Sequence, residues 1–388
     1  MRFREESIGV GDLMDTVQNR LSQEMEPQSL LPLNQLYFYL TKGCNLACRH
    51  CWLAPRFDRT GSRYPTLRVE LFETAIREAK PFGLQGVKLT GGEPLLHPHF
   101  KKLLEIVRRE GLSLNIETNG LLCTPEIAEE IAKSTKRFVS VSIDGADAAT
   151  HEWVRGVPGC FETALQAVRN LVAAGTSPQI VMCVMRCNAD QVEAIVRLAE
   201  NLGAASVKFN ILQPVGRGEA MHEGTSGLEV EELIKLGRHI DMELAPTTKV
   251  KLLFEYPPAF RPLSRMASGN DSGLCGILGI LGVIASGHYA LCGIGEHLPE
   301  FTFGVVGTDR LKDLWRDNVT LNALRVGLPT RFSGICARCL MSDRCLGYCI
   351  AQNYYRKGSI WAPFWFCEDA ERLGLFPDSR LVAAAGRL

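Results

Sequence analysis

Short apolar runs rich in β-branched residues alternate along the chain with segments whose apolar residues recur at helical spacing. In one such segment, Phe100, Leu103 and Leu104 fall on one face of a helix. Thr124 followed by Pro125 predicts a helix start, because a capping residue precedes a proline at the first helical position. The predicted strands are Leu36–Leu40, Gly86–Leu89, Leu112–Ile116, Phe138–Ile143, Ile180–Met185 and Ser206–Leu212, and the predicted helices lie near 68–80, 99–110, 125–133, 161–174 and 189–201.

These strand–helix repeats predict an α/β fold with a parallel sheet and right-handed crossovers. Eight repeats would close a TIM-like barrel, so the six repeats here predict an open, partial (β/α)6 barrel. In barrel folds the chemistry lies on loops that follow the C-terminal ends of strands. We therefore expect one face to carry the four motifs that follow the first four strands, which are the loop starting at Cys44, Gly91–Pro94, Thr118–Gly120 and Asp144–Gly145.

The pattern changes after residue 225, and the length of 388 residues suggests more than one domain. Residues 226–245 predict a helix, and residues 256–274, rich in Pro, Gly and Ser, predict a linker. The predicted organisation is an N-terminal extension over 1–33, an α/β domain over 34–225, a bridging helix and linker over 226–274, and a small cysteine-rich domain over 275–388.

Charge and hydropathy narrow the possible partners. Lys and Arg total 43, as do Asp and Glu, so the formal net charge is zero. This balance argues against a general affinity for nucleic acid or an anionic membrane. The start of the chain shows no signal peptide, and the longest apolar run, Ile277–Ala285, is too short to span a bilayer. We therefore expect a cytoplasmic protein with no nucleic-acid or membrane partner.

Fourteen cysteines are many for such a protein, and clustered cysteines with short spacings favour metal ligation in a reducing compartment. Cys44, Cys48 and Cys51 lie within eight residues. Iron–sulfur clusters usually take four cysteines, so three would leave one iron open to another ligand. A zinc site completed by a residue such as His50 is the alternative from spacing alone.

The Cys-x3-Cys-x2-Cys spacing after the first strand resembles the radical S-adenosylmethionine (SAM) superfamily, and the resemblance covers residues 34–225. It implies a [4Fe–4S] cluster whose open iron binds SAM. Reductive cleavage of SAM would give a 5′-deoxyadenosyl radical that abstracts a hydrogen atom. It also implies SAM contacts from Gly91, Gly92 and Glu93 to the amino group, from Asn119 and Ser142 to the ribose and carboxylate, from Arg155 to the carboxylate, and from His50 and Leu212 to the adenine.

Simpler interpretations of two of these motifs remain open. A turn between a strand and a helix could account for Gly91–Pro94, and a surface salt bridge could account for Arg155. Four other cysteines, Cys123, Cys160, Cys183 and Cys187, are expected to be mostly core residues, although the last two could approach a cavity.

Seven cysteines near the C-terminal end resemble the SPASM domain of radical SAM enzymes that modify peptides and proteins. This resemblance implies two auxiliary [4Fe–4S] clusters, and three clusters in all. Some members of that family have an eighth cysteine shortly before these seven. Residues 256–274 contain no cysteine, so one iron of the first auxiliary cluster would be open or take another ligand. The implied ligands are Cys275, Cys292 and Cys349 for the first auxiliary cluster and Cys336, Cys339, Cys345 and Cys367 for the second.

The combined pattern predicts an enzyme that modifies a ribosomally made precursor peptide. The aromatic tail before Cys367 resembles maturases associated with Nif11-type leader peptides, some of which are spliceases that excise tyramine. A thioether-forming or other cross-linking maturase is one alternative, and a small-molecule oxidoreductase of a haem or cofactor pathway is another. Sulfatase maturases carry an aspartate after the cysteine that corresponds to Cys292, but Gly293 stands here. The sequence therefore assigns no catalytic proton donor or acceptor.

Two further partners are expected. About 33 residues precede the first strand, which is too few for a leader-binding winged-helix module. We therefore expect a separate leader-recognition protein, or binding of the leader at a sheet edge. An external electron donor such as flavodoxin or ferredoxin would reduce the SAM-binding cluster.

Overall fold

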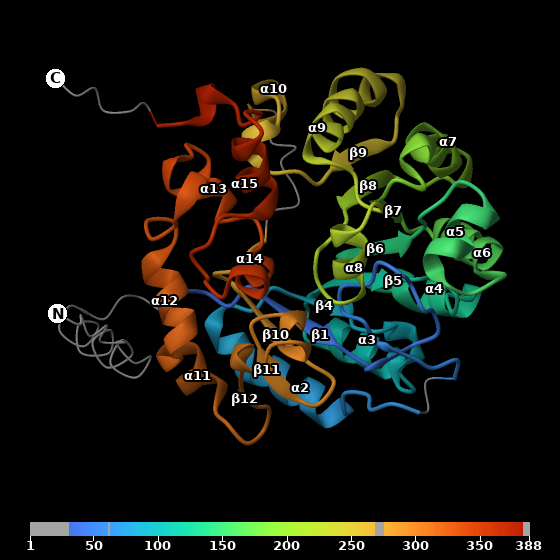
Figure 1. Cartoon of the computed structure of the whole chain (residues 1–388). Helices are drawn as coiled ribbons and strands as arrows, with labels where there is room; N and C mark the ends of the chain where they lie inside the picture. Colours follow the sequence, from blue (N-terminus) through green and yellow to red (C-terminus); the bar gives the residue numbers. More distant parts are fainter. Residues whose placement is uncertain (1–30, 61–62, 268–274, 383–388) are drawn as a thin grey trace, which may run out of the picture.

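The computed structural model describes residues 31–60, 63–267 and 275–382 (Figure 1). Its central feature is an open ten-stranded sheet in the order β12-β11-β10-β1-β4-β5-β6-β7-β8-β9. The strands from β10 to β9 in this order are parallel, and β11 and β12 are antiparallel. The bounds are Gln35–Tyr39 (β1), Gly86–Thr90 (β4), Ser113–Thr118 (β5), Arg137–Ser142 (β6), Gln179–Val184 (β7), Ser206–Ile211 (β8), Lys251–Phe254 (β9), Ile280–Val283 (β10), His288–Ala290 (β11) and Thr302–Val305 (β12).

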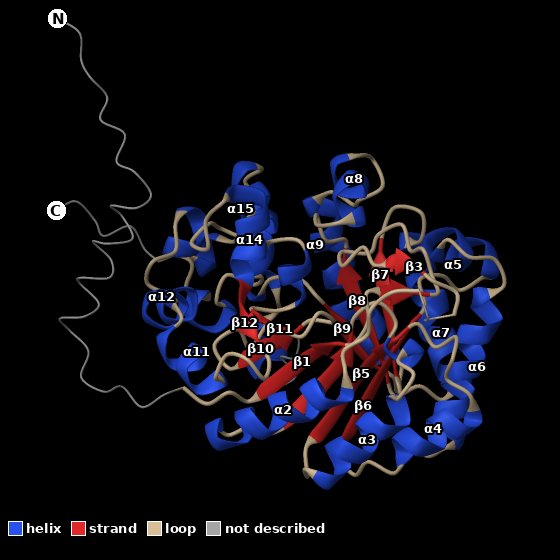
Figure 2. Ribbon diagram, turned by 90° about the horizontal axis from the view of Figure 1, so that it is seen from below, coloured by secondary structure: helices blue, strands red, loops and turns tan. Residues whose placement is uncertain are grey.

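All six predicted strands are present, and the five predicted helices connect them. Figure 2 shows the strands at the centre, with α2, α3, α4 and α6 along the outside. Thr124 caps α4 by accepting a hydrogen bond from the backbone N–H of Ile127, as its sequence predicts. The helices in this part of the chain are Val69–Ala79 (α2), Phe100–Arg109 (α3), Pro125–Ala132 (α4), Ala148–Arg155 (α5), Cys160–Ala173 (α6) and Val192–Leu202 (α7).

The two faces of the sheet differ in polarity. Val87 and Leu89 of β4 are fully buried in the main core, together with Phe72 of α2 and Leu103 of α3. Side chains alternate along a strand, so the residues between them point to the opposite, inner face. This inner face is polar, and the register places Tyr37, Lys88 and Asn115 in one row and Thr90, Glu117 and Ser140 in the next.

Beyond residue 225 the predicted helix is present, whereas the segments that follow it differ from the expectation. Helix α9 (Val230–His239) continues into one π-helical turn, Ile240–Leu244. The sheet then gains the strands β9 to β12, which the sequence did not predict. Residues 256–267, expected to begin a linker, instead form a 3₁₀ turn at Pro258–Phe260 and helix α10 (Leu263–Ala267), because Ala259 and Phe260 are buried in the core. The rest of the predicted linker lies outside the described residues.

The C-terminal part packs helices beside the added strands (Figure 1). Across the described ranges, no helix is long and apolar enough to cross a membrane. The remaining helices are Arg217–Glu223 (α8), Leu311–Asp317 (α11), Val319–Gly327 (α12), Ser342–Cys345 (α13), Ile350–Lys357 (α14) and Trp365–Arg372 (α15).

Candidate active site

The loop that carries the first three cysteines follows β1 and is held against the end of α5. The backbone N–H of Ala47 donates to the carbonyl of Arg155 (3.1 Å), and that of Arg49 donates to the carbonyl of Val154 (2.9 Å). Cys44 and Cys48 are buried with Leu46 and Cys160 in a small cluster separate from the main core, and Cys51 packs against it. The fold therefore brings the three thiols to one place.

Burial and proximity disfavour negative charge on the thiols of Cys44 and Cys48. Burial raises the pKa of Cys44 well above its ordinary value, and the neighbouring Cys48 and Glu93 raise it further. Burial also raises the pKa of Cys48, while the charge of Arg155 opposes this shift. Thiolates in this setting need a positive partner, and a metal centre would supply one.

The geometry bears on the kind of metal centre. Among the described residues, no three His, Cys, Asp or Glu side chains surround a point where a single metal ion could bind. A [4Fe–4S] cluster gives each thiolate its own iron, so its ligands stand farther apart than those of one ion. The three grouped thiols would hold three of its irons and leave one for another ligand.

The Gly91–Pro94 turn packs directly on this cysteine loop. The N–H of Gly92 donates to the Thr41 carbonyl (2.9 Å), and that of Glu93 donates to the Gly43 carbonyl (3.1 Å). A Cβ at position 92 would overlap the Gly43 carbonyl oxygen. Gly91 has φ +125°, which side chains rarely allow. The turn therefore needs both glycines to approach the loop.

Glu93 and Asn119 link this turn to the end of β5. The Glu93 carboxylate accepts hydrogen bonds from the Thr118 hydroxyl (2.6 Å) and from the N–H groups of Asn119 (2.8 Å) and Leu95 (3.1 Å). Burial nevertheless raises its pKa to about 7. The Asn119 amide nitrogen lies 3.8 Å from the Cys44 sulfur. A carboxylate and an amide thus border the candidate cluster site.

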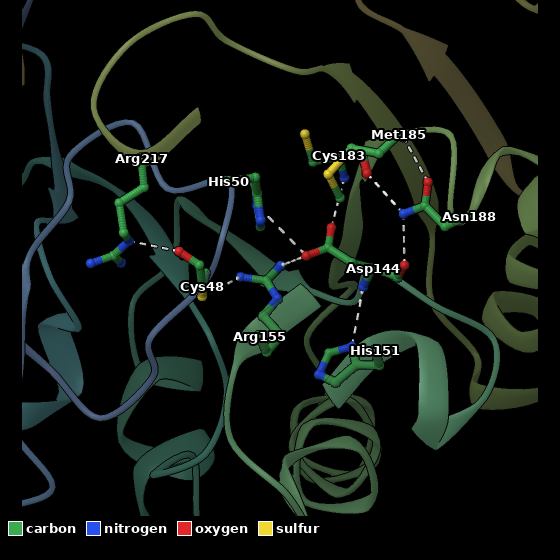
Figure 3. Close-up of polar contacts among 9 residues, drawn as sticks. All are labelled: Cys48, His50, Asp144, His151, Arg155, Cys183, Met185, Asn188 and Arg217. Carbon is green, nitrogen blue, oxygen red and sulfur yellow. Dashed lines mark hydrogen bonds and ion pairs between the residues drawn. The ribbon is translucent and has the colours of Figure 1, made fainter. Parts of the chain in front are cut away.

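Arg155 and His50 converge on one buried carboxylate, that of Asp144 (Figure 3). Arg155 Nη2 lies 2.7 Å from Asp144 Oδ2, and His50 Nε2 lies 3.7 Å from the same oxygen. Arg155 Nη1 also donates to the Cys48 sulfur at 3.6 Å. Arg155 is thus a buried residue that contacts the cysteine loop, and the surface salt bridge considered from the sequence is wrong. The sequence analysis placed Asp144 in a motif on this face but assigned it no contact with SAM.

The other two predicted SAM contacts lie nearby in the fold. Ser142 ends β6, two residues before Asp144. Leu212 follows β8 and is buried with Val154, Cys183 and Met185 in a small apolar cluster. Ser142 and Leu212 therefore lie at the C-terminal ends of their strands. The cysteine loop likewise follows the C-terminal end of β1.

The C-terminal cysteines form two separate groups. Burial raises the pKa of Cys275 to about 12, and the neighbouring Cys349 contributes to the shift. Burial likewise raises the pKa of Cys292, where Cys349 and Cys275 contribute. The second group lines one pocket together with Pro257 and Phe376, and its members are Cys336, Cys339, Cys345 and Cys367. Four thiols around one pocket fit a [4Fe–4S] cluster.

The four remaining cysteines do not join these groups as a set. Cys123, Cys160 and Cys183 are buried, whereas Cys187 is exposed. The expectation that most of the four are core residues is therefore confirmed, and the exposed Cys187 lies in the turn after β7.

Comparison with known proteins now identifies the first part of the chain. Residues 38–205 match the family model of the radical SAM superfamily. This part has the α/β radical SAM fold. The family implies bound SAM and a [4Fe–4S] cluster, and the three thiols beside Glu93 and Arg155 fit both groups.

Two relatives are similar to this chain well beyond the radical SAM domain. The AdoMet-dependent heme synthase of Methanosarcina barkeri is 29% identical over 343 residues, which cover 84% of this chain and 94% of the relative. The mycofactocin maturase MftC of Mycolicibacterium smegmatis is 29% identical over 327 residues, which cover 82% of this chain and 79% of the relative.

A solved structure shares the fold. Streptococcus suis SuiB bound to its precursor peptide SuiA matches with a TM-score of 0.68 at 17% identity, covering 95% of this chain and 83% of SuiB. The arrangement of the radical SAM domain and the C-terminal part is therefore similar to that of SuiB.

Proposed function

We propose that the protein is a radical SAM enzyme that modifies a ribosomally made precursor peptide. The observation that carries the proposal is the grouping of Cys44, Cys48 and Cys51 beside Glu93 and Arg155. This group lies at the C-terminal ends of the parallel strands. The peptide substrate is supported by two similar proteins, because MftC is a maturase and SuiB binds a precursor peptide.

Each side chain at this edge has a proposed task. When bound, the cluster and SAM supply a one-electron reduction that generates a radical able to remove a hydrogen atom from the substrate. Glu93 attracts the amino group of SAM, and Arg155 binds its carboxylate. Asn119 and Ser142 offer polar contacts to the ribose and carboxylate. His50 and Leu212 lie against the adenine, and burial lowers the pKa of His50 to about 4, so its imidazole is neutral.

We further propose that residues 275–388 form a SPASM domain with two auxiliary [4Fe–4S] clusters. The first would be held by Cys275, Cys292 and Cys349, and the second by the four thiols that share a pocket. Two members of the first group, Cys275 and Cys292, lie near Lys88 of the inner face, since the charge of Lys88 lowers the pKa of both thiols against the effect of burial. Electron transfer and direct binding of substrate are both open to such a cluster.

The inner face between the two cysteine sites offers a polar surface for the substrate. Lys88 pairs with Glu117 at 2.5 Å, and Lys208 pairs with Glu255 at 3.5 Å. Each of these two pairs is neutral overall, and polar side chains of this kind could contact a peptide segment.

A haem-pathway oxidoreductase is the second candidate, because the heme synthase relative is as similar to this chain as MftC. Incubation of the reduced enzyme with an iron porphyrin and SAM separates the two candidates. Conversion of the porphyrin without any change in a peptide would favour this second function.

Tyramine excision is a narrower hypothesis within the peptide proposal. Its support is the aromatic tail, yet the aromatics there contact the protein itself. Tyr348 stacks on Phe364 (4.4 Å) and bonds to Glu255, while Trp365 and Phe366 are buried. The tail therefore gives no evidence of a substrate contact, and the resemblance to Nif11-associated maturases rests on sequence alone. Thioether formation and other cross-links are equally compatible with the site.

Mass spectrometry of a precursor peptide tests the proposal. The peptide is co-expressed with the enzyme, without oxygen, alongside a variant in which Cys44, Cys48 and Cys51 are all alanine. We expect a mass change with the native enzyme alone, and its sign and size identify the bond made or broken. An unchanged mass, also with a leader-recognition protein and flavodoxin or ferredoxin present, would contradict peptide modification.

A further inference from the structure

We propose that Asp144 is a positioning residue for SAM, whose carboxylate holds Arg155 at the cofactor site. The inference rests on the proposed function, in which Arg155 binds the SAM carboxylate. The inference adds Asp144 to the residues proposed for the SAM site. Asp144 lies in the loop between β6 and α5.

The Asp144 side chain is fully buried and receives groups from three parts of the chain (Figure 3). Oδ1 accepts a hydrogen bond from the backbone N–H of Cys183 at 2.7 Å. Oδ2 lies 2.7 Å from Arg155 Nη2 and 3.7 Å from His50 Nε2. Burial alone would raise the pKa of Asp144, but the charge of Arg155 and these other contacts hold it below its ordinary value. The carboxylate is therefore charged at neutral pH.

The backbone of Asp144 is also fixed. Its carbonyl accepts a hydrogen bond from the Asn188 amide at 2.8 Å, and its N–H donates to His151 Nδ1 at 3.2 Å. Asn188 in turn bonds to the backbone of Cys183 and Met185. The backbone of Asp144 is thus fixed at its carbonyl and its N–H, so its carboxylate can hold the Arg155 side chain in place.

Arg155 has two possible anionic partners, Asp144 and Cys48. Its Nη1 contacts the Cys48 sulfur, while Asp144 takes Nη2. Within the described residues, Nε of Arg155, Nδ1 of His50 and Oδ2 of Asp144 are buried without a hydrogen-bond partner, and Oδ2 meets Arg155 only as an ion pair. A buried polar atom left in this state destabilises the fold. These unpaired atoms point to a polar ligand, and a carboxylate would satisfy the Arg155 donor.

The negative charge of Asp144 is what the positioning requires. An asparagine would keep the size of the side chain and could still accept from the Cys183 N–H. It would leave the Arg155 charge without its carboxylate partner, so the guanidinium would turn toward the thiolate of Cys48. Arg155 would then be misplaced for the SAM carboxylate. The loss of one charged hydrogen bond corresponds to about tenfold or more in affinity.

The test measures SAM binding by the anaerobically reconstituted enzyme, with iron content as a check on the cluster. We expect D144N to keep its iron and to raise the Kd for SAM about tenfold or more, and D144E to give a smaller loss. D147N is the matched control, because Asp147 is exposed and caps α5 through the N–H of Thr150 (2.8 Å), a task that asparagine also performs.

A second readout separates positioning from a structural role. The spectrum of the reduced cluster should shift when SAM is added to native enzyme, and the same addition should shift it less in D144N. D144N with full iron and a Kd within about twofold of the native value would overturn the inference. If D144N loses its iron, D144E decides, because it keeps the negative charge. D144E with full iron and a Kd for SAM raised about tenfold or more would then overturn the inference. Native enzyme that binds no SAM would overturn the proposed function itself.

Discussion

The Glu93 carboxylate is 1% exposed and accepts hydrogen bonds from a hydroxyl and two backbone N–H groups. These donors favour the charged form, whereas burial favours the neutral form and prevails, which raises the pKa to about 7. The same carboxylate is the proposed partner of the SAM amino group. In the SAM-free protein, ionisation of this buried carboxylate therefore lowers the stability of the fold.

This cost gives a pH-dependent prediction. Because the folded pKa of Glu93 is raised, its contribution to stability is fully present below about pH 4.5 and is lost as pH rises through 7. The native protein should therefore lose on the order of 2–3 kcal/mol relative to E93Q between about pH 5 and pH 8. Urea unfolding of cluster-free protein measures this difference. Equal pH slopes for the two proteins would contradict the burial argument.

Residue-scale prediction from sequence succeeded where a motif has a fixed spacing. The cysteine loop, Gly91–Glu93 and Arg155 lie together as expected. Asp144 could not be assigned, because an Asp-Gly pair after a strand is also typical of a simple turn. Its partners come from the cysteine loop, from α5 and from β7, and only the folded chain brings them together.

At the scale of elements, the turn after β4 and the loop after β1 act as one unit. Replacing Gly92 by alanine would place a Cβ onto the Gly43 carbonyl, which is backbone and cannot rotate away. We expect G92A to lose roughly 2–4 kcal/mol of stability and much of the iron bound near Cys44, because the turn must leave the loop.

Gly227→Ala is the matched control for this variant. A Cβ there would meet the nearest atom, Leu212 Cδ2, at an ordinary 3.7 Å. We expect its stability to change by less than about 0.5 kcal/mol and its iron content to stay native. Thermal unfolding and an iron assay check both variants. A G92A protein with native iron would show that the close approach of the two segments is not needed.

The sequence predicted the six βα repeats because each has a clear period and boundary residues. It missed β9 to β12 for two physical reasons. These strands have four or three residues each, which is too short for a period to show. Their pairing is also non-local, since Ile280 of β10 lies beside Gln35 of β1. The apolar run Ile277–Ala285 was visible, but only the open edge of β1 explains it.

At the scale of the whole molecule, the described residues include three groups of cysteines, one in the loop after β1 and two in the C-terminal part. If each group carries a [4Fe–4S] cluster, the enzyme binds about twelve iron atoms. Replacing Cys345 and Cys367 by alanine should lower this to about eight, with SAM binding retained, because these thiols line the pocket away from the cysteine loop. Iron analysis of anaerobic protein gives the count, and about four in the native enzyme would contradict the auxiliary clusters.

The central claim is that Cys44, Cys48 and Cys51 hold a cluster that cleaves SAM. The most direct test is to reduce the reconstituted enzyme with dithionite, add SAM and measure 5′-deoxyadenosine by chromatography. The account predicts that native enzyme forms it and that the variant with alanine at all three positions does not. Native enzyme with a full iron content that forms no 5′-deoxyadenosine, with or without precursor peptide, would contradict it.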